Sequence, residues 1–311
     1  MPGAIELDYY VVDVFTTAVL KGNPLAVVFN TCGLTTEQMQ AIAREFNLSE
    51  TTFIERGDLA AEHSQGVRVR IFTTQEELNF AGHPTLGTAS VLMRVAPECS
   101  ENQTVKLKLN VGTLPVRFSA AGPQSNGLHG EMTQRDPVFG AELDPDHVAR
   151  LCGLSPGDLN PELTPQVVST GTAFAIVVLR SIDALGRLKV DHDAATPWLR
   201  ENGARWFYVL APAAAIGVGP NQDPTNQPYR ARMQFNGTED PATGSAAGCA
   251  ISYLVEHRAV ASDFPVVVTQ GVEMGRTSLI HLAARKLDTG VTDVRVGGST
   301  VPVANGRLFL P

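Results

Sequence analysis

Two different titratable side chains stand at matching positions of two similar motifs in this sequence. Residues 82–89 read GHPTLGTA and residues 239–246 read EDPATGSA, so that His83 of the first motif matches Asp240 of the second, 157 positions later. A histidine and a carboxylate across one cleft can polarise a substrate or orient a proton donor. A turn histidine and a helix N-cap are the structural alternatives. Because a duplicated turn needs no titratable group here, we expect chemistry at this position.

A third candidate, Glu50, occurs in only one half of the chain. It lies in the segment SETTFI (49–54), and the matching segment ARWFYV (204–209) carries Ala204 at that position. A carboxylate at the start of one strand suits a single general acid or base, and a solvated glutamate at a strand edge is the alternative. One base returns a proton to the side from which it took it, whereas two opposed bases invert a stereocentre. The asymmetry therefore favours isomerisation over racemisation.

Both motifs have the composition of a helix start. Pro84 and Pro241 each suit the first helical position. A helix N-terminus leaves backbone N–H groups unpaired and carries a partial positive charge, so it can bind a carboxylate or phosphate. Thr88 and Ser245 can add hydroxyl donors. If the two halves face each other, a small anionic substrate can bind between the helix starts, whereas simple capped turns remain the alternative.

Further segments repeat in the same order around these motifs. They are GNPLAVVF (22–29) with GTAFAIVV (171–178), RVRIF (68–72) with RARMQF (230–235), and LNVGTLPV (109–116) with VTQGVEMG (268–275). Alternating arginines in the second pair are expected to form a solvated or ion-paired face, and contact of one of them with substrate is the alternative: Arg68, Arg70, Arg230 and Arg232. Each half is expected to place short strands around one apolar helix.

This repetition predicts an α+β fold with two similar domains related by an internal pseudo-twofold repeat. We expect residues 1–118 to form the first domain and residues 119–292 the second, with a linker at 119–132. The last strands, in residues 293–311, can return to the first domain, and composition does not decide this. A helix is predicted after Leu34, where Thr35 and Gln38 form a capping box.

Composition and charge exclude several classes of protein. The chain has 311 residues, of which 43% are hydrophobic and 18% charged, so it can bury a sizeable core. Its formal net charge of -8 argues against partners such as nucleic acid or an anionic membrane, which need a basic face. No basic segment precedes an apolar one near the start, and no apolar run approaches the roughly 20 residues that span a bilayer. We therefore expect a cytoplasmic protein.

Signatures of bound cofactors, metals and serine nucleophiles are missing from the sequence. It contains no GxxxxGK[ST] loop, no GxGxxG between a strand and a helix, and no GxSxG elbow. The four cysteines form no CxxC pair, and the seven histidines do not cluster at the spacing of metal ligands. Four free thiols that pack as small hydrophobic groups are expected.

At these residues the sequence resembles the phenazine-biosynthesis PhzF-like family. The ordered motifs that carry the resemblance run from Asp13 to Arg276: DVFTTAVLKGNPLAVV, NLSETTFI, ELNFAGHPTLGTA, EDPATGSAAG and QGVEMGR. The resemblance implies a diaminopimelate-epimerase-like fold, in which two domains each wrap a β-barrel-like sheet around a central helix. It also implies an active site in the cleft between the domains, a homodimer and no cofactor.

The same resemblance implies roles for individual residues. The catalytic glutamate, histidine and aspartate of the family fall on Glu50, His83 and Asp240. Positions that contact substrate fall on four residues of the two motifs: Gly82, Thr85, Gly244 and Ser245. The implied reaction is the movement of a proton on a small carboxylate-bearing metabolite.

Two other functions remain open on the same scaffold. Related epimerases and racemases use two cysteines, one at the head of each central helix, and this sequence has neither; Cys249 falls about two turns inside its helix. A non-catalytic metabolite-binding protein is the second alternative, and the complete set of Glu50, His83 and Asp240 counts against it. The physiological substrate is not predicted.

Overall fold

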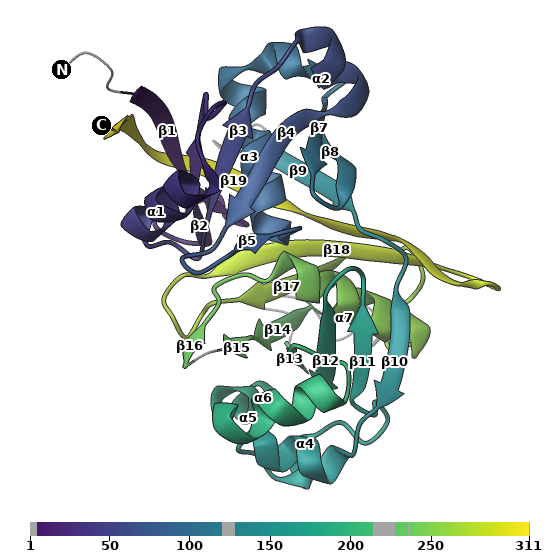
Figure 1. Cartoon of the computed structure of the whole chain (residues 1–311). Helices are drawn as coiled ribbons and strands as arrows, with labels where there is room; N and C mark the ends of the chain where they lie inside the picture. Colours follow the sequence, from purple (N-terminus) through teal and green to yellow (C-terminus); the bar gives the residue numbers. More distant parts are fainter. Residues whose placement is uncertain (1–4, 120–127, 214–227, 236, 311) are drawn as a thin grey trace. The chain divides into compact units, whose positions relative to one another are not determined.

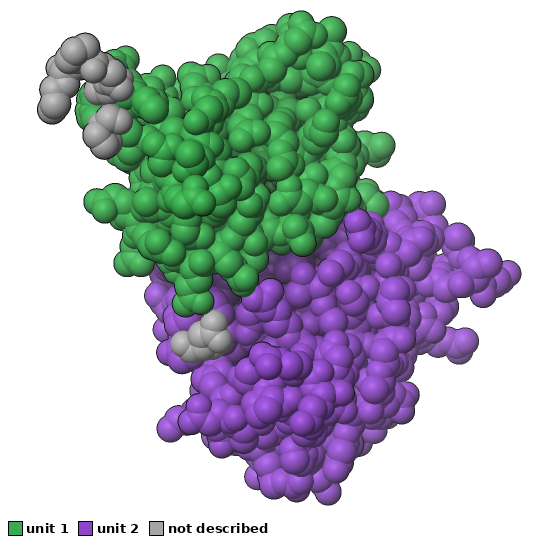
Figure 2. All heavy atoms as spheres, in the orientation of Figure 1, with its two compact units in different colours: residues 1–133, 297–311 green, residues 134–296 purple. Residues whose placement is uncertain are grey.

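The computed structural model describes residues 5–119, 128–213, 228–235 and 237–310 (Figure 1). The chain divides into two compact units, which are coloured separately in Figure 2: Met1–Thr133 with Gly297–Pro311 is unit 1, and Gln134–Val296 is unit 2. Of the segment 119–132, expected as a linker, residues 120–127 lie outside the described residues. Residues 128–132 belong to a strand instead, since Leu128–Thr133 pairs with the strand before it.

The strands of unit 1 form a closed ring. The members are β1 (Ile5–Val14), β2 (Asn23–Val28), β3 (Glu50–Glu55), β4 (Val67–Phe72), β7 (Thr104–Leu109), β8 (Gly112–Ser119), β9 (Leu128–Thr133) and the end of β19 (Gly290–Leu310). Each strand pairs with the next in this order. β19 closes the ring because it pairs with both β9 and β1. The C-terminal strand therefore belongs to unit 1 at its far end.

Helix α3 (Gly82–Val95) is the core of this ring (Figure 1). It contacts β1, β2, β3, β7, β8 and β9, and its residues from Gly82 to Leu92 are all buried. Gly87 permits the close approach, because a Cβ atom there would lie 2.6 Å from Leu25 Cδ2 and 2.8 Å from Val14 Cγ2. Small residues thus let the helix pass tightly through the ring.

Shorter elements cover the outside of unit 1. They are α1 (Thr36–Phe46), α2 (Leu59–Gln65), the 3₁₀ turn Pro97–Cys99, β5 (Glu77–Leu78) and β6 (Ser100–Glu101). The predicted helix after Leu34 is confirmed as α1, with the Thr35–Gln38 capping box in place. Its buried residues include Met39 and Ile42, which pack in a cluster with Phe53 and Phe72.

Unit 2 also wraps strands around one buried helix, α7 (Gly244–Glu256). The strands are β10 (Val138–Glu142), β11 (Gln166–Ser169), β12 (Ala173–Val178), β13 (Trp206–Pro212), β14 (Tyr229–Arg232), β17 (Val266–Gln270) and β18 (Ser278–Leu287), and β15 (Gln234–Phe235) pairs with β16 (Thr238–Glu239). Outside them lie α4 (Pro145–Leu151), α5 (Ile182–Gly186), α6 (His192–Glu201) and the 3₁₀ turn Pro156–Asp158. α7 contacts β11, β12, β13 and β18.

The two units use the same order of strand pairings. In unit 1, β1–β2, β2–β3, β3–β4, β4–β7 and β7–β8 alternate between antiparallel and parallel pairing. In unit 2, β11–β12, β12–β13, β13–β14, β14–β17 and β17–β18 follow the identical alternation. Three pairs of repeated segments therefore occupy equivalent strands: β2 with β12, β3 with β13 and β4 with β14.

The strand register corrects two of the sequence matches. Lys108 lies opposite Arg68 and Thr269 opposite Arg230, which matches Leu109 to Gln270, two residues beyond the Val268 of the sequence match.

The second correction concerns Glu50. Phe53 lies opposite Arg70, and Val209 lies opposite Arg232, so matching the two arginines matches Phe53 to Val209. Glu50 then corresponds to Trp206, two residues beyond the predicted Ala204. The cause is that the segment match relied on one aromatic residue, whereas hydrogen bonding fixes the register. Glu50 still has no acidic counterpart.

The central helices do not start at the two prolines. α3 begins at Gly82, so that Pro84 is its third residue, which a first turn tolerates because those N–H groups have no helical partner. α7 begins at Gly244, three residues after Pro241. Gln270 donates to the carbonyl of Asp240, which would otherwise accept the first bond of a helix starting at Pro241, and it also accepts from the N–H of Thr243. Asp240 is therefore not an N-cap; Thr243 is.

Within the described residues, no helix combines the length and the hydropathy needed to cross a bilayer.

Candidate functional site

Unit 1 brings two of the predicted catalytic residues together. Glu50 is the first residue of β3, and His83 is the second residue of α3. Oε2 of Glu50 lies 3.4 Å from Nε2 of His83, and the two side chains are 17% and 5% exposed. The closed ring around α3 creates this contact, because the head of the helix reaches the strand that begins at Glu50. The pair has the composition of an acid/base unit.

Asn23 contacts the other nitrogen of the histidine ring. Asn23 is fully buried at the start of β2, and its Nδ2 lies 3.2 Å from Nδ1 of His83. Ser49 donates to Oδ1 of Asn23 at 3.3 Å, which favours an amide orientation that turns Nδ2 toward the ring. Asn23 was not predicted from the sequence, although a polar residue at the start of an apolar strand could have indicated it.

Burial lowers the pKa of His83 to about 3, so that the ring is neutral near pH 7. A neutral ring carries one proton, and the group that faces Nδ1 decides where it lies. The Asn23 amide, with Nδ2 turned to Nδ1, donates to that nitrogen, so the ring proton lies on Nε2. In this tautomer Nε2–H can donate to a glutamate anion. His83 is therefore placed to support the ionised form of Glu50.

The remaining unit 1 candidates lie in the first turns of α3. Gly82 is the first residue of the helix, and its N-cap residue Ala81 makes no side-chain cap bond. The Thr85 hydroxyl donates to the carbonyl of Ala81 at 2.7 Å. The Thr88 hydroxyl is 2.8 Å from that of Thr52, and both residues are fully buried. Thr88 thus joins helix to strand and is not placed to contact a substrate.

Unit 2 holds the third predicted catalytic residue, Asp240, in a turn just before α7. Its backbone N–H donates to Met233 at 2.9 Å, and its Oδ2 accepts from the Thr243 hydroxyl at 2.6 Å. Gly244 and Ser245, expected to contact substrate, are the first two residues of α7. Thr243 makes no side-chain cap bond with this helix, so its hydroxyl serves Asp240.

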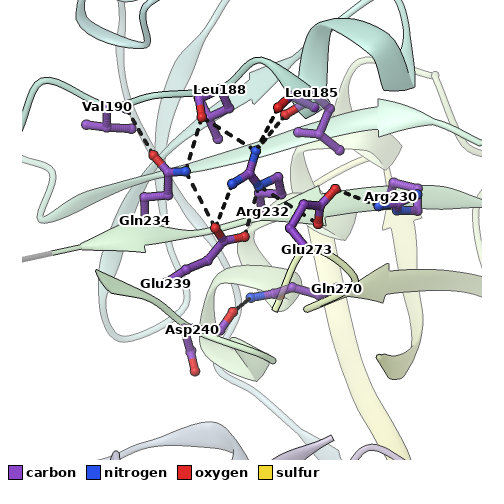
Figure 3. Close-up of polar contacts among 11 residues, drawn as sticks. Leu185, Leu188, Val190, Arg230, Arg232, Gln234, Glu239, Asp240, Gln270 and Glu273 are labelled. Atoms are coloured by element: carbon purple, nitrogen blue, oxygen red, sulfur yellow. Dashed lines mark hydrogen bonds and ion pairs between the residues drawn. The ribbon is translucent and has the colours of Figure 1, made fainter. Parts of the chain in front are cut away.

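A buried arginine anchors the residue next to Asp240 (Figure 3). Nε and Nη2 of Arg232 lie 2.9 and 2.7 Å from the two carboxylate oxygens of Glu239, and Nη1 donates to Leu185 at 3.1 Å. In unit 1, Arg70 forms the same bidentate pair with Glu77, also seven residues further on. The predicted ion-paired faces are confirmed for these arginines.

Two further kinds of chemistry find no support in the described part of the chain. No group of three or more histidine, cysteine or acidic side chains is placed there to hold a metal ion. All four cysteines are free, and burial raises the pKa of Cys249 to about 11. Neither helix head carries a thiol, since α3 begins with Gly82 and α7 with Gly244.

Known proteins resemble this chain over nearly its whole length. The family model described as phenazine biosynthesis-like protein matches residues 12–306. An uncharacterized isomerase of Mesorhizobium japonicum is 35% identical over 309 residues, covering 97% of this chain and 99% of the relative. A trans-2,3-dihydro-3-hydroxyanthranilate isomerase of Pseudomonas fluorescens is 33% identical over 306 residues, with the same coverage of 97% and 99%.

A solved structure supports the same relationship. It is that of a predicted epimerase from Pseudomonas aeruginosa, which is 34% identical in sequence. The TM-score is 0.80, and the match covers 97% of this chain and 98% of the other. The α+β, epimerase-like fold expected from the sequence is thereby confirmed.

Proposed function

The chain belongs to the phenazine biosynthesis-like protein family, and from this premise we propose that it is an isomerase that moves a proton on a small carboxylate-bearing metabolite, without a cofactor. The observation that carries the proposal is the contact of 3.4 Å between Glu50 and His83. It pairs a carboxylate with a neutral imidazole, both largely buried from solvent, which suits proton transfer at carbon.

Glu50 acts as the single acid/base in this mechanism. It removes a proton from one carbon of the substrate and returns it to another carbon from the same side. Its counterpart by strand register is Trp206, so the duplicated unit offers no second base at that position. His83 supports the anion of Glu50 by offering Nε2–H, since Asn23 donates to its Nδ1. This asymmetry favours isomerisation over racemisation.

The predicted substrate-binding role is kept for residues at the head of the central helix of each unit and for Asp240. Gly82 and Thr85 stand in the first turn of α3, and Gly244 and Ser245 in the first turn of α7. Neither helix is capped by its N-cap side chain, so backbone N–H groups at both heads suit a carboxylate. Asp240 is assigned to a hydrogen-bond donor of the substrate, because its carboxylate accepts from Thr243.

The curated relative from Pseudomonas fluorescens is named for trans-2,3-dihydro-3-hydroxyanthranilate. A small cyclic carboxylic acid of that kind is accordingly the first substrate to examine for this chain.

Proton exchange in D₂O tests the proposal. The protein is incubated with a panel of small carboxylic acids that includes this dihydro-hydroxyanthranilate, and the exchange of C–H for C–D is followed by NMR. Catalysed exchange with formation of a double-bond isomer is expected for at least one acid. Binding without exchange across the panel would instead identify a metabolite-binding protein.

We also propose that the protein acts in the cytoplasm as a homodimer and binds neither nucleic acid nor membrane. The net charge of -8 supports the choice of a small substrate over a polyanion. Four unpaired thiols suit a reducing compartment.

A further inference from the structure

Gln270 occupies the centre of a buried hydrogen-bond network beside Asp240. It is the last residue of β17 and is fully buried. Its Oε1 accepts from the Tyr208 hydroxyl at 3.0 Å and from the backbone N–H of Thr243 at 3.1 Å. Its Nε2 donates to the backbone carbonyl of Asp240 at 2.8 Å and to the Thr243 hydroxyl at 2.9 Å. Figure 3 shows the bond from Gln270 to Asp240.

These four bonds fix the orientation of the amide. A backbone carbonyl can only accept, and a backbone N–H can only donate. Nε2 of Gln270 must therefore face the backbone carbonyl of Asp240, and Oε1 must face the backbone N–H of Thr243. A flip would set the amide oxygen against a carbonyl and the NH₂ group against an N–H, and it would leave buried polar groups unsatisfied.

The fixed amide determines where the Thr243 hydroxyl proton points. The oxygen of that hydroxyl already accepts from Nε2 of Gln270. Its own proton is then directed at Oδ2 of Asp240, 2.6 Å away. The Thr243 hydroxyl is thus a fixed donor to the Asp240 carboxylate and is not oriented to accept a hydrogen bond from a protonated Asp240. Such a bond favours the charged form of an acid over the protonated form.

The equivalent positions of unit 1 are apolar. Lys108 lies opposite Arg68, and Thr269 lies opposite Arg230, so Lys108 and Thr269 are equivalent positions. The next residues along the two strands, Leu109 and Gln270, are therefore equivalent too. Thr243 matches Leu86 through the motif that aligns His83 with Asp240. Leu86 and Leu109 are buried in the core of unit 1. The repeated scaffold therefore folds with leucine at both places, and the polar pair occurs only beside Asp240.

We infer that Gln270 is a positioning residue, which acts through Thr243 to hold Asp240 ionised and oriented as a hydrogen-bond acceptor. The inference rests on the proposed function, since that function gives Asp240 its role toward the substrate. It implies that Asp240 binds a donor group such as an amine or a hydroxyl, and that Asp240 does not supply the migrating proton.

Three other titratable groups of unit 2 are Tyr208, Glu239 and Cys249. Burial raises the pKa of Tyr208, and the charge of Asp240 adds to that effect, so Tyr208 stays a neutral donor. Glu239, the residue before Asp240, forms an ion pair with Arg232. Nε of Arg232 also lies 3.9 Å from Oε2 of Glu273. Burial raises the pKa of Cys249, which keeps that thiol neutral.

The test is a ligand-free titration of Asp240 by carbon-13 NMR of labelled aspartate side chains, with the signal assigned by loss in Asp240→Asn. Thr243→Val removes the donor, while the helix loses no side-chain cap. We expect its Asp240 to titrate about one pH unit or more above the wild type, and Thr243→Ser to titrate as the wild type does. An Asp240 titration in Thr243→Val equal to that of the wild type would overturn the inference.

Changes at Gln270 itself separate direct positioning from general loosening. Gln270→Glu, once ionised, draws the Thr243 proton to itself and adds a like charge, so it should raise the Asp240 midpoint further than Thr243→Val does. Gln134→Leu is the matched control: Gln134 is a buried amide of the same unit that donates to Gly244 at 2.9 Å. An equal shift in this control would contradict the inference.

Activity measurements then distinguish this inference from the proposed function. If the wild type is active, the acid limb of the pH profile of kcat/KM should lie at higher pH in Thr243→Val, by the same shift as the Asp240 titration. A wild type that exchanges no substrate proton would refute the proposed function, whereas the titration would still decide whether Gln270 and Thr243 control Asp240.

Discussion

The contact between Glu50 and His83 depends on residues that are far apart in the sequence. His83 sits in the first turn of a helix with its ring almost fully buried, and Asn23 of another element contacts the ring from its other side. Sequence motifs predicted the titratable residues, because a histidine in one copy and an aspartate in the other break the repeat. Asn23, Thr243 and Gln270 were not predicted as parts of the site, since a single polar residue at a strand end has many structural uses.

Burial of His83 makes the stability of the protein depend on pH. The unfolded histidine titrates near its usual value of about 6.5, whereas the folded pKa is about 3. Between these values the unfolded state binds more protons, so the free energy of unfolding falls as pH decreases through that window. His83→Gln should remove up to about 1.4 kcal/mol per pH unit of that fall. Urea unfolding of both proteins at pH 7 and pH 5 measures the difference; parallel pH dependences would contradict the buried neutral ring.

Loss of Asn23 should reduce turnover without removing the acid/base itself. Asn23→Ala frees the His83 ring to rotate, and we expect kcat to fall at least about tenfold, but less than the loss of about 10²–10⁴ for the proton-transfer group. Ser49→Ala is the control, because Ser49 contacts Asn23 and contributes only one bond of 3.3 Å. Steady-state kinetics would refute the role of Asn23 if Ser49→Ala proved the more damaging change.

Element boundaries show what local sequence can and cannot predict. The Thr35 capping box was predicted because its bonds lie within one turn. The start of α7 was missed because Gln270, on a distant strand, donates to the carbonyl of Asp240, which would otherwise accept the first bond of a helix that starts at Pro241. The match of Glu50 to Ala204 was two residues short for the same reason: register is set by pairing between strands, not within one.

The close passage of α3 through its ring predicts a strong effect of one added methyl group. Gly87→Ala would place a Cβ atom 2.6 Å from Leu25 Cδ2, and the clash should lower the free energy of unfolding by about 1–3 kcal/mol. Gly57→Ala is the control, since a Cβ atom there meets nothing within 4 Å. Denaturant unfolding compares the two, and an equal stability of both variants would contradict the packing described.

The whole molecule is two units built on one order of strand pairings. The α+β class and the central helices were predictable because the repeated motifs carry them. The closure of unit 1 by β19 was left open, because it joins residues 5–14 to 300–310, and no local pattern encodes so distant a pairing. Three catalytic residues were predicted from the sequence, and the structure describes two of them, Glu50 and His83, in contact.

The assembly is a prediction of its own. If the protein resembles its family in this respect, it is a homodimer, and light scattering coupled to gel filtration should give about twice the chain mass of 33.2 kDa. A mass of one chain that persists across a range of loading concentrations would contradict the dimer and leave the site chemistry untouched.

The central claim is that Glu50 alone carries the migrating proton. Its most direct test is the rate of substrate C–H to C–D exchange in D₂O for the wild type and for Glu50→Gln, with the fold of each checked by thermal unfolding. We predict that exchange falls about 10²–10⁴-fold in Glu50→Gln while the protein stays folded. A folded Glu50→Gln variant that exchanges protons at the wild-type rate would contradict the account.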